Sequence, residues 1–251
     1  MPSSARTPGR PGPPDFIGAG GIGTGVAWWV ETLFAHPELR PPESGKRSLH
    51  YFDPFAMEEM TAADVSGYHA QFPHVPGVLR GEWTGRYMLD GWTPPLLRRA
   101  APDARLIVML GDPLTRYRWI FAQRREKFAA DEVFYTTDLV ERSRHASQLE
   151  RLHRFFPSEQ VLVLQYERCV RAPETELVRT QRFIGLPVEA IDPGRPGALD
   201  DAPSARLPGA LHAALRSAYA ADVAALPALV PGIDLSLWSD YGPTSRGRMA
   251  P

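Results

Sequence analysis

Short, uninterrupted apolar runs are the clearest pattern along the chain. The runs ARLIVML at Ala104–Leu110 and QVLVLQ at Gln160–Gln165 are typical of strands that are buried on both faces of a parallel sheet. Asp15–Gly18 predicts another buried strand, which leads into a glycine-rich turn, and Val78–Trp83 predicts a further one. The segment Leu49–Phe52 predicts one more short strand.

Between these runs, apolar residues recur at helical spacing. We expect helices over Val26–His36, Ala63–Phe72, Pro94–Ala101, Pro113–Lys127, Asp138–Phe156, Glu174–Ile184 and Gly209–Leu226. Strands that alternate with helices of this length predict an α/β fold in three layers, with a central parallel sheet. Ligands of such folds bind at the carboxyl ends of the strands, which here follow Ile17, surround Gly81–Trp83 and follow Leu110.

The pattern predicts one domain, because it contains no internal repeat and no long linker. We place this domain at residues 15–239. Residues 1–14 are rich in proline, serine, glycine and arginine and predict a disordered N-terminal arm. Residues 240–251 predict a flexible C-terminal tail.

Composition narrows the classes of function. The chain has 251 residues, with 28 basic and 29 acidic side chains and a formal net charge of −1, which argues against a nucleic-acid or membrane-surface binder. No apolar run approaches the ~18–20 residues that span a bilayer, and no secretory leader is visible. The single cysteine, Cys169, excludes an internal disulfide and a multi-cysteine metal cage, so we expect a cytoplasmic protein without a metal site. Lys46 and Lys127 are its two lysines, and the other basic residues are arginines.

The glycine-rich turn at 18–25 allows three interpretations. Its GAGGIG spells G-x-G-x-x-G between a strand and a helix, as in dinucleotide sites. Such a site also needs a strand that ends in an acidic residue about 20 positions later, but residues 37–43 are too rich in proline for a central strand. A nucleoside-triphosphate loop would need Gly-Lys-Ser/Thr, which is missing, and a tight turn without any ligand is the third alternative. In each case the amides at the start of the Val26 helix favour an oxyanion nearby.

Longer segments, in order and with regular spacing, resemble the sulfotransferase family. They are DFIGAGGIGTGVAWWVETLFAHPEL, KRSLHYFD, Gly81-Glu82-Trp83-Thr84 with Tyr87, PDARLIVMLGDPLTRYRW, VLVLQYERCVRAPETELVRTQRFIGLP and LPGALHAALRSAYAADVAAL. The chain is similar to the bacterial and heparan-type carbohydrate sulfotransferases across residues 15–238. This resemblance implies a P-loop-like sulfotransferase fold in which the donor, 3′-phosphoadenosine 5′-phosphosulfate, lies across the strand ends.

The resemblance also shows that residues with which the family holds this donor are replaced. It places Gly21, Trp83, Gly111, Trp119 and Ser48 at the positions of two lysines, an arginine, a serine and a glutamate base, in that order. A charge-assisted bond to phosphate or sulfonate contributes about 1.5–3 kcal/mol, so the loss of three cations weakens donor binding by about 5–9 kcal/mol. We also expect the ring of Trp119 to obstruct the 3′-phosphate pocket. The sequence therefore predicts that the donor site is dismantled and that no cofactor is bound.

Polar residues near the strand ends remain candidates for chemistry. For binding a sulfate or another anion they are Gly20, Gly21, Ile22, Gly23 and Thr24 of the turn, with Arg86 and Arg116. The candidate catalytic residues are Glu82, Asp53 and His50.

Structural alternatives accompany three of these side chains and Asp112, a further candidate base. Asp112, which precedes Pro113, is typical of a helix N-cap. Arg116 either pairs with Asp112 or braces the loop, and His50 is expected to be a core histidine. An unpaired carboxylate in a buried strand end is costly, so we expect Glu82 to pair with an arginine or to face substrate.

Three functions follow from these observations. The first is an enzyme that acts on an already sulfated biosynthetic intermediate, by sulfate elimination or by an intramolecular displacement that closes a ring, for example an aziridine. The second is an active sulfotransferase with atypical donor contacts. The third is a non-catalytic partner of a sulfotransferase. The expected ligand is a sulfated or anionic small molecule, either free or bound to a carrier protein, and a homodimer or a complex with a sulfotransferase stays open.

Overall fold

A five-stranded sheet of parallel strands forms the centre of the molecule. The structure is a computed structural model that describes residues 9–21, 23–128, 138–196 and 206–242. The strands are β1 (Phe16–Gly18), β2 (Leu39–Arg40), β3 (Leu79–Trp83), β4 (Arg105–Leu110) and β5 (Val161–Gln165). Their order in the sheet is β2-β3-β1-β4-β5, and each neighbouring pair is parallel.

Strand β1 occupies the middle of the sheet and pairs with β3 on one side and β4 on the other. Ile17 lies opposite Glu82 of β3 and Leu106 of β4. The chain order changes direction at β1, so the segments that follow β1, β3 and β4 meet at one edge of the sheet, where open α/β folds bind ligands.

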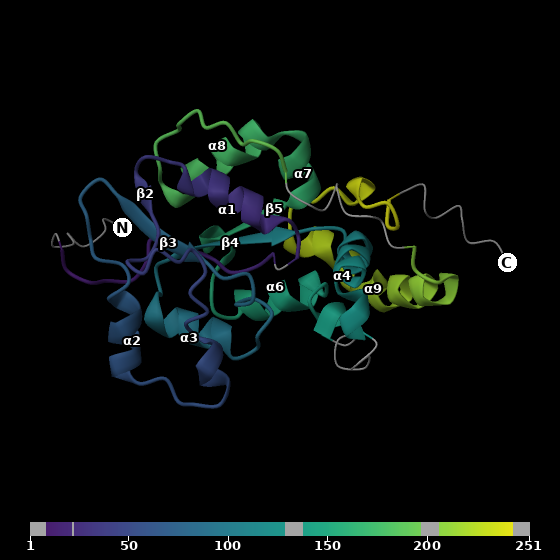
Figure 1. Ribbon diagram of the computed structural model, residues 1–251, viewed down its shortest axis with the longest axis horizontal. Coiled ribbons are helices and arrows are strands. Elements are labelled where there is room, and N and C mark those ends of the chain that lie inside the picture. Colours follow the sequence, from purple (N-terminus) through teal and green to yellow (C-terminus); the bar gives the residue numbers. More distant parts are fainter. Residues whose placement is uncertain (1–8, 22, 129–137, 197–205, 243–251) are drawn as a thin grey trace.

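One face of the sheet is covered by α1 (Val26–Phe34), α7 (Tyr166–Arg171) and α8 (Pro173–Ile184), which lie above it in Figure 1. The apolar side of α1 contributes Trp29 and Leu33, which pack with Ile107 and Leu164 of the strands. Helix α8 ends at Gly185, whose φ of 88° suits the left-handed cap of a helix.

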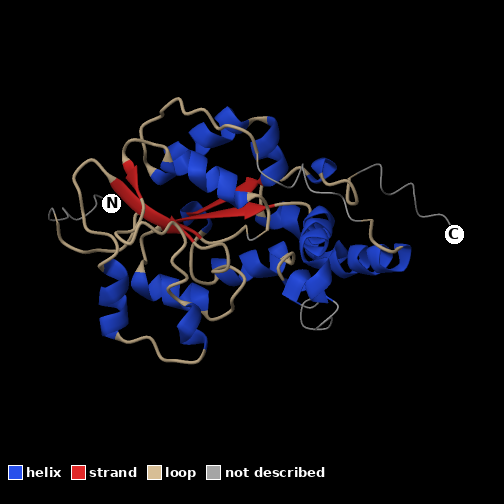
Figure 2. Cartoon of the chain, viewed as in Figure 1, coloured by secondary structure: helices blue, strands red, loops and turns tan. Residues whose placement is uncertain are grey.

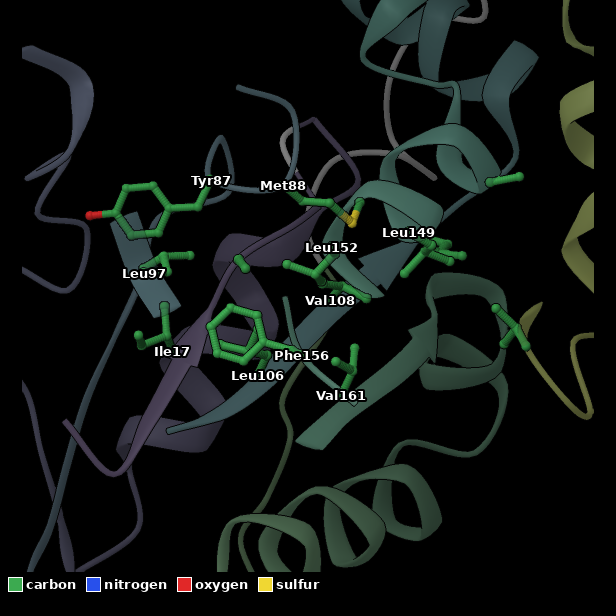
Figure 3. Packing of buried hydrophobic residues seen from close by; sticks show 14 of the residues in the cluster. Ile17, Tyr87, Met88, Leu97, Leu106, Val108, Leu149, Leu152, Phe156 and Val161 are labelled. Carbon is green, nitrogen blue, oxygen red and sulfur yellow. The ribbon is translucent and has the colours of Figure 1, made fainter. Parts of the chain in front are cut away.

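The other face is covered mainly by α2 (Ala62–His69), α3 (Thr93–Ala100) and α6 (His145–His153), and α4 (Pro113–Phe128) and α9 (Gly209–Leu229) lie beyond one end of the sheet (Figure 1). Figure 3 shows sheet residues such as Leu106 and Val108 packed against Leu152 and Phe156 of this layer. Strands between two helical layers are visible in Figure 2. The three-layer α/β fold with a central parallel sheet is therefore confirmed.

Several local predictions need correction. Residues 49–52 form no strand, and the short strand β2 at Leu39–Arg40 was missed, as was α7. The helix expected over Asp138–Phe156 is interrupted at residues 142–144. The reason is a contact across the fold: Asp222 of α9 accepts hydrogen bonds from the backbone amides of Ala146 and Ser147, both at 2.9 Å, and so caps a new helix start.

The two ends of the chain lie partly outside the described residues. Within the segment assigned to a disordered arm, residues 9–14 are ordered: Gly9 N donates to His74 O at 2.7 Å, and Pro11 pairs with Pro73. Short 3-10 helices at Asp53–Ala56, Ser158–Gln160 and Leu235–Leu237 complete the described elements. No helix among the described residues is long and apolar enough to cross a membrane.

Candidate functional site

The glycine-rich turn joins the central strand β1 to helix α1 at the carboxyl edge of the sheet. Gly21, Gly23 and Gly25 have φ values of 100°, 74° and 70°, a backbone region that side chains with a Cβ atom rarely adopt. Thr24 is buried, and its hydroxyl donates to the carbonyl of Gly21 at 2.7 Å. Ile22, also predicted to bind an anion, lies outside the described residues. The sequence of the turn is therefore explained by its backbone geometry.

Trp83, the last residue of β3, lies against this turn. Its indole Nε1 donates to the carbonyl oxygen of Gly20 at 2.8 Å, and the side chain is almost completely buried. A Cβ atom on Gly18 would lie 2.0 Å from Trp83 Cδ2, so the absence of a side chain at Gly18 makes room for the ring. The indole thus fills the space between β3 and the glycine-rich turn.

A cavity of about 110 Å³ lies between the turn and the end of β4. Its lining residues come from the turn, from the start of α4, from α7 and from the segment after α9; they are Thr24, Gly111, Asp112, Thr115, Arg116, Tyr166, Glu167, Leu237 and Ser239. Trp119 of α4 is not one of them; its side chain is half-buried and packs against the core. The cavity is thus where the predicted anion-binding residues Thr24 and Arg116 meet.

Two carboxylates line this cavity. Asp112 Oδ1 accepts from the amides of Leu114 at 2.9 Å and Thr115 at 3.3 Å, which confirms it as the N-cap of α4. Glu167 accepts from the backbone amide of Asp112 at 2.8 Å and from Trp238 Nε1 at 3.0 Å. Burial raises the pKa of both carboxyl groups, against the effect of these hydrogen bonds. Sequence reasoning missed Glu167, since nothing local distinguishes it from a surface glutamate.

Arg116 is buried beside the turn rather than paired with the Asp112 side chain. Its Nη1 donates to the hydroxyl of Ser143, and a Cβ atom on Gly23 would lie 3.4 Å from its Nε. Burial lowers the pKa of Arg116 to about 9. This placement supports the prediction that Arg116 braces the loop.

His145, at the start of α6, is the second buried base of this region. Its Nε2 lies 3.0 Å from Gly111 O, and since a carbonyl can only accept, Nε2 carries the proton. Burial, with Arg116 nearby, lowers the pKa of His145 to about 4, so the imidazole is neutral at pH 7. His145 therefore supports the backbone at the end of β4 as an uncharged group.

Glu82 is completely buried among hydrogen-bond donors without charge. Tyr68 and Tyr87 donate their hydroxyls to Oε1 at 2.8 and 3.0 Å. Thr84 Oγ1 donates to Oε2 at 2.7 Å, and the Leu49 amide donates to the same oxygen at 3.1 Å. Burial raises the pKa of Glu82 and, together with the nearby carboxylate, raises that of both tyrosines. The prediction that Glu82 pairs with an arginine or faces substrate is wrong: four neutral donors satisfy it.

His50 lies outside the core, contrary to expectation. Its side chain is 49% exposed, and its Nδ1 lies 3.0 Å from Asp53 Oδ2. The backbone of His50 has a φ of 52°, the one positive value recorded for a non-glycine residue in the described parts of the chain. The residue is exposed because its backbone bonds to Thr84 and turns the side chain outward, a tertiary contact that the neighbouring Tyr51 and Phe52 did not indicate.

Arg86 has a carboxylate partner. Its Nη2 and Nε donate to the two oxygens of Asp90 at 2.8 and 3.2 Å. The bond to Asp90 raises the pKa of Arg86, and Asp53 and Asp138 add to this effect from further away. The Asp90 side chain is 5% exposed, so the ion pair stabilises the fold at a buried carboxylate. Arg86 keeps partial access to solvent.

The predicted site residues thus form two groups at one edge of the sheet. Gly20, Gly21, Gly23, Thr24 and Arg116 surround the turn. Glu82 belongs to β3, and His50, Asp53 and Arg86 lie near the carboxyl end of that strand. Trp83 joins the groups, since it follows Glu82 and bonds to Gly20. Thr84 and Tyr87 belong to the segment that supports the resemblance, but their hydrogen bonds to Glu82 were not foreseen.

The family model described as "Sulfotransferase family" matches residues 31–190. The chain belongs to the sulfotransferase family. The match includes β3, β4 and β5, and with them His50, Asp53, Glu82, Arg86 and Arg116, but it begins after β1 and the glycine-rich turn.

Curated sulfotransferases resemble this chain at low identity. Human heparan sulfate glucosamine 3-O-sulfotransferase 6 is 27% identical over 209 residues, which are 73% of this chain and 59% of the relative. Human heparan sulfate glucosamine 3-O-sulfotransferase 3B1 is 27% identical over 172 residues, 62% of this chain and 42% of the relative. The chain therefore spans about half the length of these curated sulfotransferases.

Solved structures agree with the fold. The crystal structure of a sulfotransferase from Alicyclobacillus acidocaldarius superposes with a TM-score of 0.71 at 23% identity and covers 89% of this chain and 98% of its own. The sulfotransferase domain from the curacin biosynthetic pathway has a TM-score of 0.52 at 14% identity, with 76% of this chain and 80% of that one covered. The sulfotransferase fold of the chain is thus established by structure as well as by sequence.

Proposed function

We propose that this member of the sulfotransferase family does not use the phosphosulfate donor and instead acts on a small biosynthetic intermediate that already carries a sulfate. The protein would bind the leaving sulfate while a nucleophile of the same substrate displaces it. A carrier protein could present this substrate. Membership of the family supports an enzyme, and the replacement of the residues that the resemblance assigns to donor binding supports the departure from sulfate transfer.

The position of Trp83 carries the proposal. The resemblance aligns this residue with a lysine that contacts the donor, and in the structure a buried indole bonded to Gly20 occupies that place. An indole N–H that is already bonded to a carbonyl has no donor left for a sulfonate, and its ring excludes water and ligand from the same volume. Gly21 offers no side chain at the other lysine position.

The charges of the cavity support the same conclusion. Asp112 and Glu167 line it together with Arg116, at the end of β4 where the resemblance expects the donor's phosphates. Carboxylates repel phosphate groups in a site of low dielectric constant, and each repulsion is stronger there than in water. A donor with several negative charges is therefore disfavoured, whereas a single sulfate near the amides of the turn and Arg116 is compatible with the site.

His50 and Asp53 supply the proposed base. Asp53 accepts from Nδ1 of the imidazole, which leaves Nε2 as the acceptor for a substrate proton. In the proposed step the substrate nitrogen loses its proton to His50 Nε2 and forms a bond to the carbon that bears the sulfate. The carbon–oxygen bond to the sulfate breaks, and sulfate leaves with the bonding electron pair. The products are a ring, for example an aziridine, and free sulfate.

Calorimetric titration with 3′-phosphoadenosine 5′-phosphate tests the loss of the donor site. We expect no binding heat, with an intact sulfotransferase measured in parallel as the positive control. Binding in the micromolar range would overturn the proposal and favour a sulfotransferase with atypical donor contacts.

Release of sulfate tests the reaction itself. The protein is incubated with sulfate monoesters of vicinal amino alcohols, beginning with 2-aminoethyl hydrogen sulfate, and free sulfate is measured by ion chromatography. We expect release above the background rate, and a large loss of release in His50→Asn and in Asp53→Asn. If the whole panel of amino-alcohol sulfates gives no release, the elimination reaction is contradicted and the non-catalytic partner is favoured.

A further inference from the structure

The hydroxyl groups around Glu82 connect its carboxylate to the segment that carries His50. Thr84 Oγ1, which donates to Glu82, lies 3.1 Å from the amide nitrogen of Leu49 and 3.2 Å from that of His50. Tyr87 Oη, which also donates to Glu82, lies 3.0 Å from the amide nitrogen of Tyr51. The three successive backbone amides of residues 49–51 therefore each donate to a hydroxyl group that itself donates to Glu82.

The carboxylate determines the direction of these bonds. An ionised carboxylate can only accept, so the hydrogens of both hydroxyls point at Glu82. The lone pairs of the two hydroxyl oxygens are then free to accept hydrogen bonds from the backbone amides. Each hydroxyl thus acts as donor to Glu82 and as acceptor from the backbone. Figure 3 shows the Tyr87 hydroxyl pointing away from the other labelled residues of the cluster. Without the carboxylate the hydroxyl hydrogens have no fixed direction, and their ability to accept from the amides is weakened.

The segment that is held in this way has an unfavourable backbone conformation. His50 has a φ of 52°, in the left-handed region where a residue with a Cβ atom is strained. Strained residues keep such a conformation when surrounding contacts enforce it. The amide of His50 and those on either side of it are all bonded to the two hydroxyls, and the backbone amide of Trp83 additionally donates to Arg47 O at 2.6 Å.

We propose that Glu82 is a positioning residue for His50: through the hydroxyls of Thr84 and Tyr87 it holds the backbone of residues 49–51 in the conformation that directs the imidazole to Asp53. The inference rests on the proposed function insofar as His50 is its base, but the positioning itself can be tested without a substrate. Glu82 does not exchange a proton with substrate, because its side chain has no exposure and its oxygens accept four hydrogen bonds.

Hydrogen exchange measured by NMR on the full chain tests this positioning. Thr84→Val keeps the volume of the side chain and removes the hydroxyl, so the amide of His50 should exchange about tenfold faster. The amide of Leu49 should be accelerated less, because it also donates to Glu82. Tyr87→Phe should have the same effect on the amide of Tyr51 as Thr84→Val has on that of His50. Glu82→Gln should accelerate all three amides, and Thr84→Ser, which keeps the hydroxyl, should restore the slow exchange of the wild-type protein.

Tyr68→Phe is the matched control, because Tyr68 donates to the same carboxylate oxygen as Tyr87 but holds none of the three amides. It should leave their exchange within about threefold of the wild-type rate if positioning passes through Thr84 and Tyr87. The ¹⁵N chemical shifts of the His50 imidazole supply a second signature. They should show a proton fixed on Nδ1 in the wild-type protein and in Tyr68→Phe, and a mixture of tautomers in Glu82→Gln.

The outcomes separate this inference from the proposed function. Unchanged exchange in Thr84→Val and Glu82→Gln overturns the positioning by Glu82, whatever the protein does to sulfate esters. Faster exchange of amides throughout the protein, instead of at residues 49–51, also overturns it and assigns Glu82 a general stabilising effect. Faster exchange confined to residues 49–51 supports the positioning even if the amino-alcohol sulfates release no sulfate.

Discussion

Trp83 Nε1 donates a hydrogen bond of 2.8 Å to the carbonyl oxygen of Gly20, and this contact ties the end of β3 to the turn after β1. The two residues are 63 positions apart in the sequence. The contact closes a space in which the sulfotransferase resemblance expects a cation. The indole thus stabilises the fold, and in the function proposed above it also excludes the donor.

Trp83→Phe tests the energetic contribution of this bond. The variant keeps most of the ring but leaves the buried carbonyl of Gly20 without its donor, so the free energy of unfolding should fall by about 2 kcal/mol. Urea denaturation measures the change. Trp92→Phe is the control, because Trp92 also donates to a carbonyl, that of Phe52 at 3.2 Å, but is 37% exposed and water can replace the bond. Equal losses in both variants would contradict a special contribution of Trp83.

Gly18→Ala tests the close approach of the Trp83 ring. The new Cβ atom would lie 2.0 Å from Trp83 Cδ2, which should lower the free energy of unfolding by about 2 kcal/mol or more. Combined with Trp83→Ala, which removes both Cδ2 and the Cγ atom 2.1 Å from the new Cβ, the substitution at Gly18 should cost about 1–2 kcal/mol less, a coupling that a double-mutant cycle in urea detects. Gly12→Ala, where no atom lies within 4 Å of the new Cβ, should be close to neutral. Additive effects of Gly18→Ala and Trp83→Ala would show that the Trp83 side chain does not set the requirement for glycine.

Arg86→Met separates a structural function of this arginine from anion binding. Asp90 is 5% exposed and would lose its partner, so the free energy of unfolding should fall by about 3 kcal/mol at neutral pH. Burial already raises the pKa of Asp90, and in the variant the carboxyl can bind a proton more readily. A group with a raised pKa in the folded state lowers stability as the pH rises, so the loss should shrink toward acidic pH.

The control for this variant is Arg144→Met, because the pair of Arg144 with Glu141 is exposed and should contribute less than about 0.5 kcal/mol. Asp90→Asn in the Arg86→Met background should recover part of the stability. If Arg86→Met unfolds like the wild-type protein but binds sulfate esters less tightly, Arg86 serves the anion and not the fold.

The buried His145 should lower the free energy of unfolding in acid. Its pKa in the folded state is about 4, against 6.5 for a free histidine, and the cause is burial beside Arg116. Between these pH values the unfolded chain binds a proton at His145 and the native protein does not. The free energy of unfolding therefore decreases as the pH falls from about 6.5 to about 4.

Urea denaturation of the wild-type protein and of His145→Gln across this pH range isolates the effect. The glutamine amide retains a donor for Gly111 O but does not titrate, so the variant should lose less stability in acid. The buried carboxyl groups of Asp112 and Glu167 have raised pKa values and act in the opposite direction, but they are present in both proteins. Parallel pH profiles for the two proteins would contradict the assignment.

Local sequence determined most of the fold. The apolar runs at β4 and β5 and the helical periodicities predicted three layers around a parallel sheet, because burial on one or both faces imprints the spacing of apolar residues. Asp112 before Pro113 was recognised as an N-cap for a similar reason: the carboxylate bonds to amides two and three residues later. Contacts of this short range can be predicted from neighbouring residues.

The tertiary structure decided the site. The sequence placed Glu82, His50 and Arg86 near strand ends, but residues from other elements determine whether each is exposed or buried. Tyr68 and Leu49 donate hydrogen bonds to the buried Glu82, and Thr84 accepts a hydrogen bond from the backbone of the exposed His50. The helix expected from Asp138 was interrupted by Asp222, a residue far along the chain. The free energy of a carboxylate or an arginine is determined by the groups packed around it, and these groups come together only when the sheet assembles.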